Sequence, residues 1–290
     1  MQAGDVGPGT VRGVPTVTVR DVSLHYTDQG EGPPVVFLHG TGASSFIWER
    51  SIPQLPPGRR LIAYDRRGFG ESGGPLARRL RDHVDDAAAL IDALDAAPAM
   101  IVTQSGGAPI ALALTIAYPA AISALVMAEP AYQVAMHPAP SLTSAMTKLL
   151  WRMLVRRDRA AAVVGYYRWA SRFTTGGNAY DGYPERWQAI AMSHADATLR
   201  EVIQLIPPWP RAAAVRRISC PTTLVIGDNG EPVFRRTTRR VHRLLAQSHL
   251  TDVNGASHLI PADQPDLFAE AVAAAAGLGP PPGFDVATDG

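Results

Sequence analysis

The sequence of 290 residues predicts an α/β fold: a mostly parallel twisted sheet with helices on both faces and an inserted helical cap. Three observations support this prediction. Short apolar runs typical of buried strands alternate with runs of helix length, both before residue 130 and after residue 216. Residues 101–107 lead from an apolar strand through a turn rich in small side chains into a helix. Residues 130–216 are a series of helical segments with many aromatic side chains.

The chain opens with residues 16–20 and 22–26, which alternate apolar and polar side chains with the two-residue period of half-buried strands. Arg20 and Asp21 form the turn of this predicted hairpin. Residues 34–39 are apolar nearly throughout, as expected of a strand covered on both faces of a parallel sheet. The later predicted elements are, in order, strand 61–64, helix 83–94, strand 99–102, helix 108–118, strand 122–127, strand 222–226, helix 233–245, strand 250–253 and helix 264–275.

We therefore expect a flexible leader (1–14), a core (15–129 and 217–276), a helical cap (130–216) and a flexible tail (277–290). The leader contains glycine and proline, and the run Pro-Pro-Pro-Gly in the tail cannot pack as a regular element. Because the cap follows the carboxyl end of a strand, it should cover that edge of the sheet and enclose a pocket. Most of its aromatic side chains should pack onto the core, and a minority should face a substrate.

The composition excludes several classes of protein. The net charge is +1, from 27 basic and 26 acidic residues with both signs interspersed, so nucleic-acid binding is not expected. A single cysteine, Cys220, excludes an internal disulfide, and no apolar run reaches the length of about 18 residues that a membrane span needs. We predict a cytoplasmic protein with a small-molecule substrate, no membrane partner and no cofactor; the sequence leaves a homodimer open. No His, Cys or Asp cluster has metal-ligand spacing, so no metal is predicted.

Ser105 is the predicted nucleophile. It lies between a strand and a helix, where a sharp turn lifts a serine hydroxyl above the carboxyl edge of a sheet. The usual pattern is Gly-x-Ser-x-Gly, whereas here Thr103 occupies the first glycine position and Gly107 the second. Small residues around the turn still allow the strand and the helix to pass close together.

Residues 70–74 match Gly-x-Ser-x-Gly letter for letter, but Pro75 follows and no helix begins before about Leu80. Ser72 is therefore not predicted to be a nucleophile. Residues 68–73 also match the dinucleotide pattern Gly-x-Gly-x-x-Gly without opening a helix, so no nucleotide site is predicted there.

His258 is the predicted general base, because it follows the strand 250–253 at the same edge of the sheet as Ser105. The backbone N–H of Gly106, directly after the nucleophile, should donate to a developing oxyanion, and the N–H of Thr41 is the candidate for the second donor. The Thr41 hydroxyl is a candidate for a third bond. Gly40, before Thr41, forms the turn.

The remaining histidines are assigned to structural or surface positions. His39 should brace the loop after its strand. We expect exposed or helix-face positions for His25, His83, His242 and His249. His137 and His194 lie in the predicted cap, and His194 is the one that we expect to contact substrate. Gly40, Gln104 and Trp187 complete the predicted substrate contacts.

Three carboxylates are candidates for the acid that orients His258. Asp228 and Glu231 follow the strand 222–226, but Asp228 comes early in its loop and Glu231 late. Glu129 ends the strand 122–127, directly before Pro130, where a carboxylate has few structural reasons to be. We favour Glu129, and Glu231 and Asp228 remain open.

Four motifs in order, residues 38–48, residues 64–73, the turn at Ser105 and residues 255–258, resemble the α/β-hydrolase fold superfamily. The resemblance covers about residues 15–276 and implies that fold, with a helical cap and serine chemistry. A carboxylate at the position of Glu129 is similar to the arrangement in fungal zearalenone lactone hydrolases, which implies a lactone or bulky ester.

The resemblance also narrows the reaction class. Haloalkane dehalogenases and epoxide hydrolases of this superfamily have aspartate where this chain has Ser105, so both are disfavoured. Perhydrolases and C–C bond hydrolases keep serine and stay open. The sequence predicts a serine hydrolase that cleaves an ester or lactone of a medium-to-bulky apolar substrate. The alternative is a non-hydrolytic member of the fold, a small-molecule receptor or a rearrangement or cyclisation enzyme.

Overall fold

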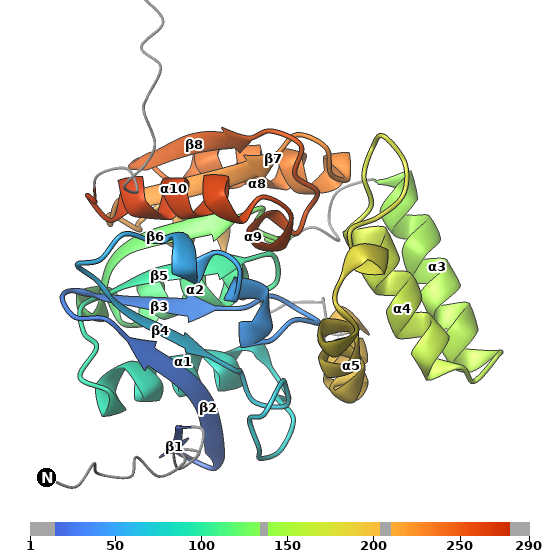
Figure 1. Cartoon of the computed structure of the whole chain (residues 1–290), viewed down its shortest axis with the longest axis horizontal. Coiled ribbons are helices and arrows are strands. Elements are labelled where there is room, and N and C mark those ends of the chain that lie inside the picture. The colour runs from blue at the N-terminus through green and yellow to red at the C-terminus, as the bar shows by residue number, and fades with distance from the viewer. Residues whose placement is uncertain (1–14, 134–138, 204–209, 279–290) are drawn as a thin grey trace, which may run out of the picture.

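The computed structural model describes residues 15–133, 139–203 and 210–278. The fold that these residues form is built on a single eight-stranded sheet with the order β1-β2-β4-β3-β5-β6-β7-β8 (Figure 1). The strands are β1 Thr16–Val19, β2 Val22–Gln29, β3 Pro34–Leu38, β4 Arg60–Tyr64, β5 Ala99–Gln104, β6 Ile122–Ala128, β7 Thr222–Gly227 and β8 Ser248–Val253.

The first strands are antiparallel, β1 to β2 and β2 to β4, and the remaining pairs are parallel. This confirms the predicted α/β fold and each predicted strand. The largest difference lies in β2, which was expected to end at Tyr26 and continues to Gln29 because it pairs with β4 as far as Leu61. The polar residues at its end lack the apolar pattern on which the prediction depended.

Helices cover both faces of the sheet, as Figure 1 shows. They are α1 Leu80–Ala93, α2 Gly107–Ala117, α8 Pro232–Leu244, α9 Ile260–Asp263 and α10 Pro265–Ala275. Successive residues of β3 point to opposite faces. Val36 and Leu38 pack in the cluster with α1, α2 and α8, whereas Val35 and Phe37 pack in the cluster with α10. Two apolar layers therefore enclose the sheet and fix its register.

In the part of the chain that the structure describes, five further α-helices lie between β6 and β7, and we call them the inserted helices: α3 Pro140–Leu154, α4 Arg159–Ala170, α5 Glu185–Ser193, α6 Ala195–Ile203 and α7 Ala212–Val215. In Figure 1, α3, α4 and α5 lie beside the sheet, on the right of the view. Aromatic pairs hold them together and to the core. Tyr167 stacks on Tyr180 with ring centroids 5.1 Å apart, and Trp187 packs on Phe46 at 5.2 Å.

His25, for which we expected an exposed or helix-face position, is buried in β2, so that expectation was wrong; His83 lies on helix α1, as expected, and is also buried. His25 Nδ1 lies 2.9 Å from Asp65 Oδ2, and the hydrogen bond to Asp65 raises the pKa of His25. Asp65 also accepts from the N–H groups of Ser45 and Glu71. Each histidine has a carboxylate partner far away in the sequence, Asp65 for His25 and Glu201 for His83, and periodicity cannot indicate such a partner. His242 is half-buried and His249 exposed; His137 lies outside the described residues.

Over the described residues, no helix combines the length and apolarity needed to cross a bilayer. Within the same ranges, no group of three or more His, Cys, Asp or Glu side chains is arranged to hold a metal ion.

Candidate active site

Ser105 occupies the turn between β5 and α2 with a φ of +52°, in the left-handed region that residues with a side chain seldom adopt. Neighbouring backbone holds it there. The N–H of Ser105 donates to Ala128 O at 2.9 Å, and Ser105 O accepts from the N–H of Ala131 at 3.1 Å. Strained backbone of this kind gathers at functional sites, where the surrounding structure stabilises it.

The departure from the usual serine motif is accommodated inside the fold. The hydroxyl of Thr103 donates to Leu38 O at 2.7 Å, so this buried hydroxyl has a hydrogen-bond partner. A Cβ on Gly107 would overlap this hydroxyl. Glycine at position 107 therefore makes room for threonine at position 103, and the turn keeps its shape.

Ser105, His258 and Glu129 form one chain of hydrogen bonds. Ser105 Oγ lies 2.7 Å from His258 Nε2, and His258 Nδ1 lies 2.8 Å from Glu129 Oε2. All three side chains are buried. The order of the sheet explains the contact, because β5, β6, β7 and β8 are neighbours and their carboxyl ends lie at one edge.

Glu129 is itself fixed in an unusual conformation, with a φ of +40°. Its N–H donates to Val225 O at 3.0 Å, and its Oε1 accepts from the N–H of Gly227 at 3.2 Å. The carboxylate therefore has one oxygen bound to the end of β7 and the other directed at His258. This geometry favours a proton on Nδ1 of His258 and leaves Nε2 free to accept from Ser105.

Burial dominates the electrostatics of this pair. It raises the pKa of Glu129 well above its ordinary value, against the bond from Gly227 N–H, which lowers it. Burial lowers the pKa of His258 below the ordinary value of imidazole. A neutral imidazole at neutral pH is the form that can act as a general base.

The two predicted oxyanion donors lie side by side. A Cβ on Gly106 would overlap Thr41 Oγ1 and lie 3.1 Å from Thr41 N, so the two backbone segments approach as closely as glycine permits. The Thr41 hydroxyl, however, donates to Glu201 Oε2 at 2.8 Å. Its single proton is used there, so the expected third bond to an oxyanion is not available in this arrangement.

Glu201, on α6, joins the inserted helices to this loop and was missed by sequence reasoning. Arg66 Nη1 lies 2.5 Å from Glu201 Oε1, and His83 Nε2 lies 2.8 Å from the same oxygen. Burial by itself would raise the pKa of Glu201, but Arg66 and His83 outweigh burial and hold it below its ordinary value. Thr41 is therefore held by a carboxylate that is ionised at neutral pH.

The two alternative acids are bonded elsewhere. Asp228 Oδ1 accepts from the N–H of Gly255 at 2.7 Å. Glu231 Oε2 accepts from the hydroxyl of Ser141 at 2.8 Å, and its Oε1 lies 3.0 Å from Arg172. Of the three candidates, Glu129 is the one that the structure places on His258.

Two of the four predicted substrate contacts, Gln104 and Gly40, lie next to the catalytic residues. Gln104 donates to His258 O at 3.1 Å and so supports the loop that carries the imidazole. Gly40 lies against Gln104 and Ser105, and its carbonyl accepts from Arg66.

Trp187 and His194 make packing contacts. Trp187 is buried and donates to Glu49 Oε2 at 3.1 Å. His194 has both ring nitrogens occupied, Nδ1 by the N–H of Gly70 and Nε2 by Gly42 O, each at 3.2 Å. A ring nitrogen that is already bonded is not free for a substrate, so His194 connects α5 and α6 to two core loops.

Phe234, on α8, was also missed. Its ring stacks on His258 with the centroids 3.4 Å apart and the planes 8° from parallel. A phenylalanine on the apolar face of α8 is expected to be a core residue, and no signal in the sequence connects it with a histidine 24 positions away. The stack covers one face of the imidazole and contributes to its desolvation.

A family model described as the alpha/beta hydrolase fold matches residues 33–265. A haloalkane dehalogenase of Mesorhizobium japonicum is 37% identical over 115 residues, which are 39% of this chain and 37% of that protein. The chain thus spans little more than a third of the length of this curated relative.

Solved structures extend the similarity over most of the chain. Est816, described as an N-acyl homoserine lactone degrading enzyme, superposes with a TM-score of 0.73 at 21% identity, covering 90% of this chain and 99% of that one. A thermophilic esterase from Thermogutta terrifontis gives a TM-score of 0.72 at 20% identity, covering 89% and 96%. At these identities the likeness shows the fold alone.

Proposed function

The chain belongs to the alpha/beta hydrolase fold family, and on that premise we propose that it is a serine hydrolase of carboxylic esters or lactones. The observation that carries the proposal is the buried chain from Ser105 Oγ through His258 to Glu129, with both contacts at hydrogen-bonding distance. Solved structures of the same fold include an esterase and a lactone-degrading enzyme, and both activities agree with this proposal.

The proposed reaction begins when Ser105 Oγ attacks the ester carbonyl and His258 Nε2 takes the hydroxyl proton. Negative charge develops on the carbonyl oxygen, and we assign the neighbouring N–H groups of Gly106 and Thr41 to receive it. The tetrahedral intermediate collapses to an acyl-enzyme on Ser105 as His258 returns its proton to the leaving alcohol. Water, deprotonated by His258, then releases the acid and restores the hydroxyl of Ser105.

An apolar substrate is favoured by the side chains next to the reacting groups. Ala131, Ala139, Leu142, Val233 and Phe234 form an apolar cluster of their own, contributed by core loops, α3 and α8. Phe234 from this cluster touches His258, and the backbone of Ala131 touches Ser105. We propose that the cluster borders the medium-to-bulky apolar part of the ester or lactone.

Dehalogenation, the activity named for one relative, does not suit a serine nucleophile. Displacement of a halide by Ser105 Oγ would leave an alkyl ether, which has no carbonyl for water to attack, so the enzyme would not turn over. A carboxylate nucleophile leaves an ester instead, and water can release it. Ser105 thus favours acyl transfer.

The test is labelling with a fluorophosphonate, followed by intact-mass measurement and peptide mapping. We expect one adduct, on Ser105, with labelling abolished in Ser105→Ala and reduced at least about a thousandfold in His258→Ala. Ser72→Ala is the matched control, because Ser72 donates to Asp65 O within a structural turn. A folded protein that a small fluorophosphonate fails to label would favour the alternative, a non-hydrolytic receptor or rearrangement enzyme.

A further inference from the structure

The end of α3 carries apolar side chains that project from the protein. We call residues 148–157 the α3 tip. Leu150, Trp151, Leu154 and Val155 are 41%, 51%, 72% and 66% exposed. At 100° per residue these four positions fall within about 140° of the helix surface, so they form one face. Leu149, on the other side of the helix, is buried and secures α3 to the inserted helices.

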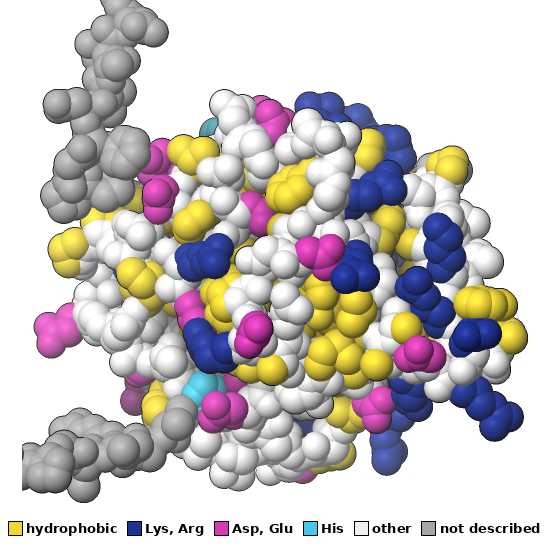
Figure 2. Space-filling view, turned by 45° about the vertical axis from the view of Figure 1, so that its right-hand side comes forward, with side chains coloured by type: hydrophobic (Ala, Val, Ile, Leu, Met, Phe, Trp, Pro, Cys, Tyr) yellow, Lys and Arg dark blue, Asp and Glu magenta, His cyan; other side chains and the backbone are white. Residues whose placement is uncertain are grey.

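Cations surround this face. Residues 140–172, which span α3 and α4, hold seven Lys or Arg and a single Asp, a net charge of +6, whereas the whole chain carries +1. The rest of the protein is therefore net negative. Figure 2 shows Lys and Arg side chains over the right-hand part of the molecule, with hydrophobic side chains exposed among them. The near-neutral total had suggested an even distribution, but the charge is polarised.

The cations at the α3 tip are the ones without acidic partners. Arg159, Arg168 and Arg172 form ion pairs with Asp196, Asp181 and Glu231. Among the described residues, no ion pair with Asp or Glu involves the remaining four, and these are Lys148, Arg152, Arg156 and Arg157. Arg156 lies over the ring of Trp151, 5.6 Å from its centroid. Unpaired positive charge thus coincides with the exposed apolar face.

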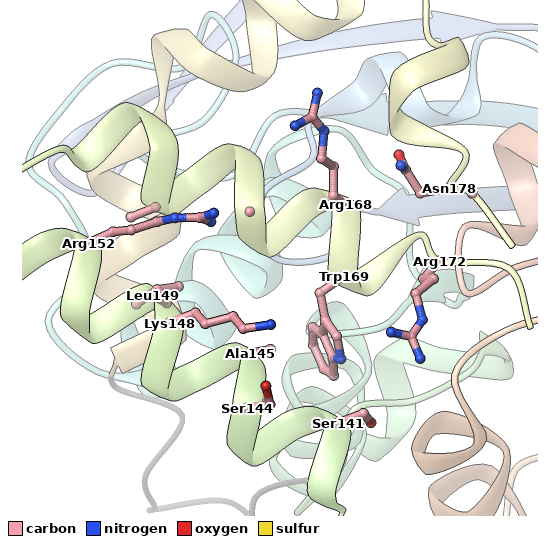
Figure 3. A pocket seen from close by; sticks show the side chains of 13 residues that line it. Ser141, Ser144, Ala145, Lys148, Leu149, Arg152, Arg168, Trp169, Arg172 and Asn178 are labelled. Atoms are coloured by element: carbon pink, nitrogen blue, oxygen red, sulfur yellow. The ribbon is translucent and has the colours of Figure 1, made fainter.

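A hollow between α3 and α4 adds room for an anion. It has a volume of about 360 Å³, and its lining includes no Asp or Glu. Figure 3 shows Lys148 and Arg152 extending from α3 toward it, with the hydroxyls of Ser141 and Ser144 further along the same helix. Gly165 lets the Arg152 guanidinium lie against α4, because a Cβ there would overlap it. The Ser141 hydroxyl already donates to Glu231, so the donors that suit a phosphate group here are the Lys148 ammonium, the Arg152 guanidinium and the Ser144 hydroxyl.

We propose that the α3 tip docks on an anionic lipid surface. Trp151, Leu154 and Val155 would enter the interface between headgroups and acyl chains, and the unpaired cations would contact the phosphates, with Lys148 and Arg152 offering the hollow to one headgroup. This surface binding needs no membrane span and revises the expectation of no membrane partner. It is independent of the reaction at Ser105.

A second copy of the chain fits this face less well. A twofold dimer brings the same patch of both subunits together, so each α3 tip would meet the like charges of the other. Four unpaired cations on each side would be buried without carboxylates, which is unfavourable. An anionic surface satisfies both the apolar and the charged part of the tip.

The experiment is co-sedimentation of the full chain with vesicles of phosphatidylcholine alone and of phosphatidylcholine mixed with phosphatidylglycerol, at low and high salt. We expect binding to the anionic vesicles only, weakened by salt. Lys148→Gln and Arg156→Gln should each weaken it about fivefold. The double variant Trp151→Ser/Leu154→Ser should weaken it at least about tenfold.

Two controls match these changes elsewhere on the surface. Arg239→Gln removes an exposed cation of α8, and Leu250→Ser removes an exposed leucine of β8. Both should bind as the parent does, and every variant should keep the parental circular dichroism. The proposal is overturned if anionic vesicles fail to bind the parent or if the controls lose binding equally. It is also overturned by a third result: light scattering shows that the parent is a dimer, this dimer does not bind vesicles, and the variant Trp151→Ser/Leu154→Ser is a monomer.

Discussion

The substitution Glu129→Gln tests the assignment of the acid most directly, because it changes one charge and almost no volume. In the parent, Oε1 of Glu129 accepts from the N–H of Gly227 and Oε2 faces His258 Nδ1. A glutamine has only one oxygen. If that oxygen stays on Gly227, the amide NH2 faces His258 and forces Nδ1 to be an acceptor. The proton then sits on Nε2, and His258 cannot accept from Ser105.

The opposite orientation of the amide is also unfavourable. With the oxygen on His258, the NH2 group meets the buried N–H of Gly227, donor against donor, which costs about 1 to 3 kcal/mol. The nonproductive tautomer is therefore preferred, and the charge that stabilises the imidazolium is lost in both orientations. We expect kcat to fall by about 10³ to 10⁴, corresponding to roughly 4 to 5.5 kcal/mol of transition-state stabilisation.

The assay is hydrolysis of p-nitrophenyl butyrate, together with the rate of fluorophosphonate labelling at Ser105. Asp228→Asn and Glu231→Gln are the matched controls, since each removes one carboxylate charge from the neighbouring loop. Both should stay within about fivefold of the parent, because neither side chain contacts His258. The reasoning is refuted if Glu129→Gln keeps near-parental turnover while either control loses several orders of magnitude.

Three further predictions concern the surroundings of Ser105. Gly106→Ala should lower kcat about 10² to 10³-fold, since its methyl group would displace Thr41 from the oxyanion position; near-parental hydrolysis by a folded variant would argue against that role. Glu201→Gln should lower the free energy of unfolding by about 3 kcal/mol, measured with urea, because the buried Arg66 loses its counter-charge; an unchanged midpoint would contradict this. As the pH is lowered, kcat/KM should fall with a midpoint below pH 6.5, because burial lowers the pKa of His258 and the base acts in its unprotonated form. A midpoint at or above pH 7 would contradict the lowered pKa.

Much of the fold was readable because the signals are local. Apolar runs of strand length and the amphipathic pattern of helices such as α1 depend on neighbouring residues, so their order along the chain was predicted correctly. Ser105 could be proposed as the nucleophile for the same reason, since a strand, a tight turn and a helix in succession leave a continuous pattern. His258 required one more step, the rule that parallel strands present their carboxyl ends at one edge.

Contacts between segments that are distant in the sequence could not be predicted from it. Glu201 and Thr41 lie 160 positions apart, and His83, for which an exposed or helix-face position was expected, is buried against the partly buried Glu201. The aromatic residues between β6 and β7 predicted packing without saying which of them meets which. Trp187 illustrates this, because its partner Phe46 belongs to a short 3-10 helix of the core, Ser45–Trp48.

The sequence by itself determined the class of fold, the strained turn at Ser105 and the histidine that serves it, because periodicity and turn sterics act over a few residues. Only the tertiary structure chose among three carboxylates and placed Phe234 on the imidazole. The contact of Glu129 with His258 depends on the order of the strands in the sheet, and the contact of Phe234 depends on how α8 packs. Both bring together side chains that lie more than 20 positions apart in the sequence.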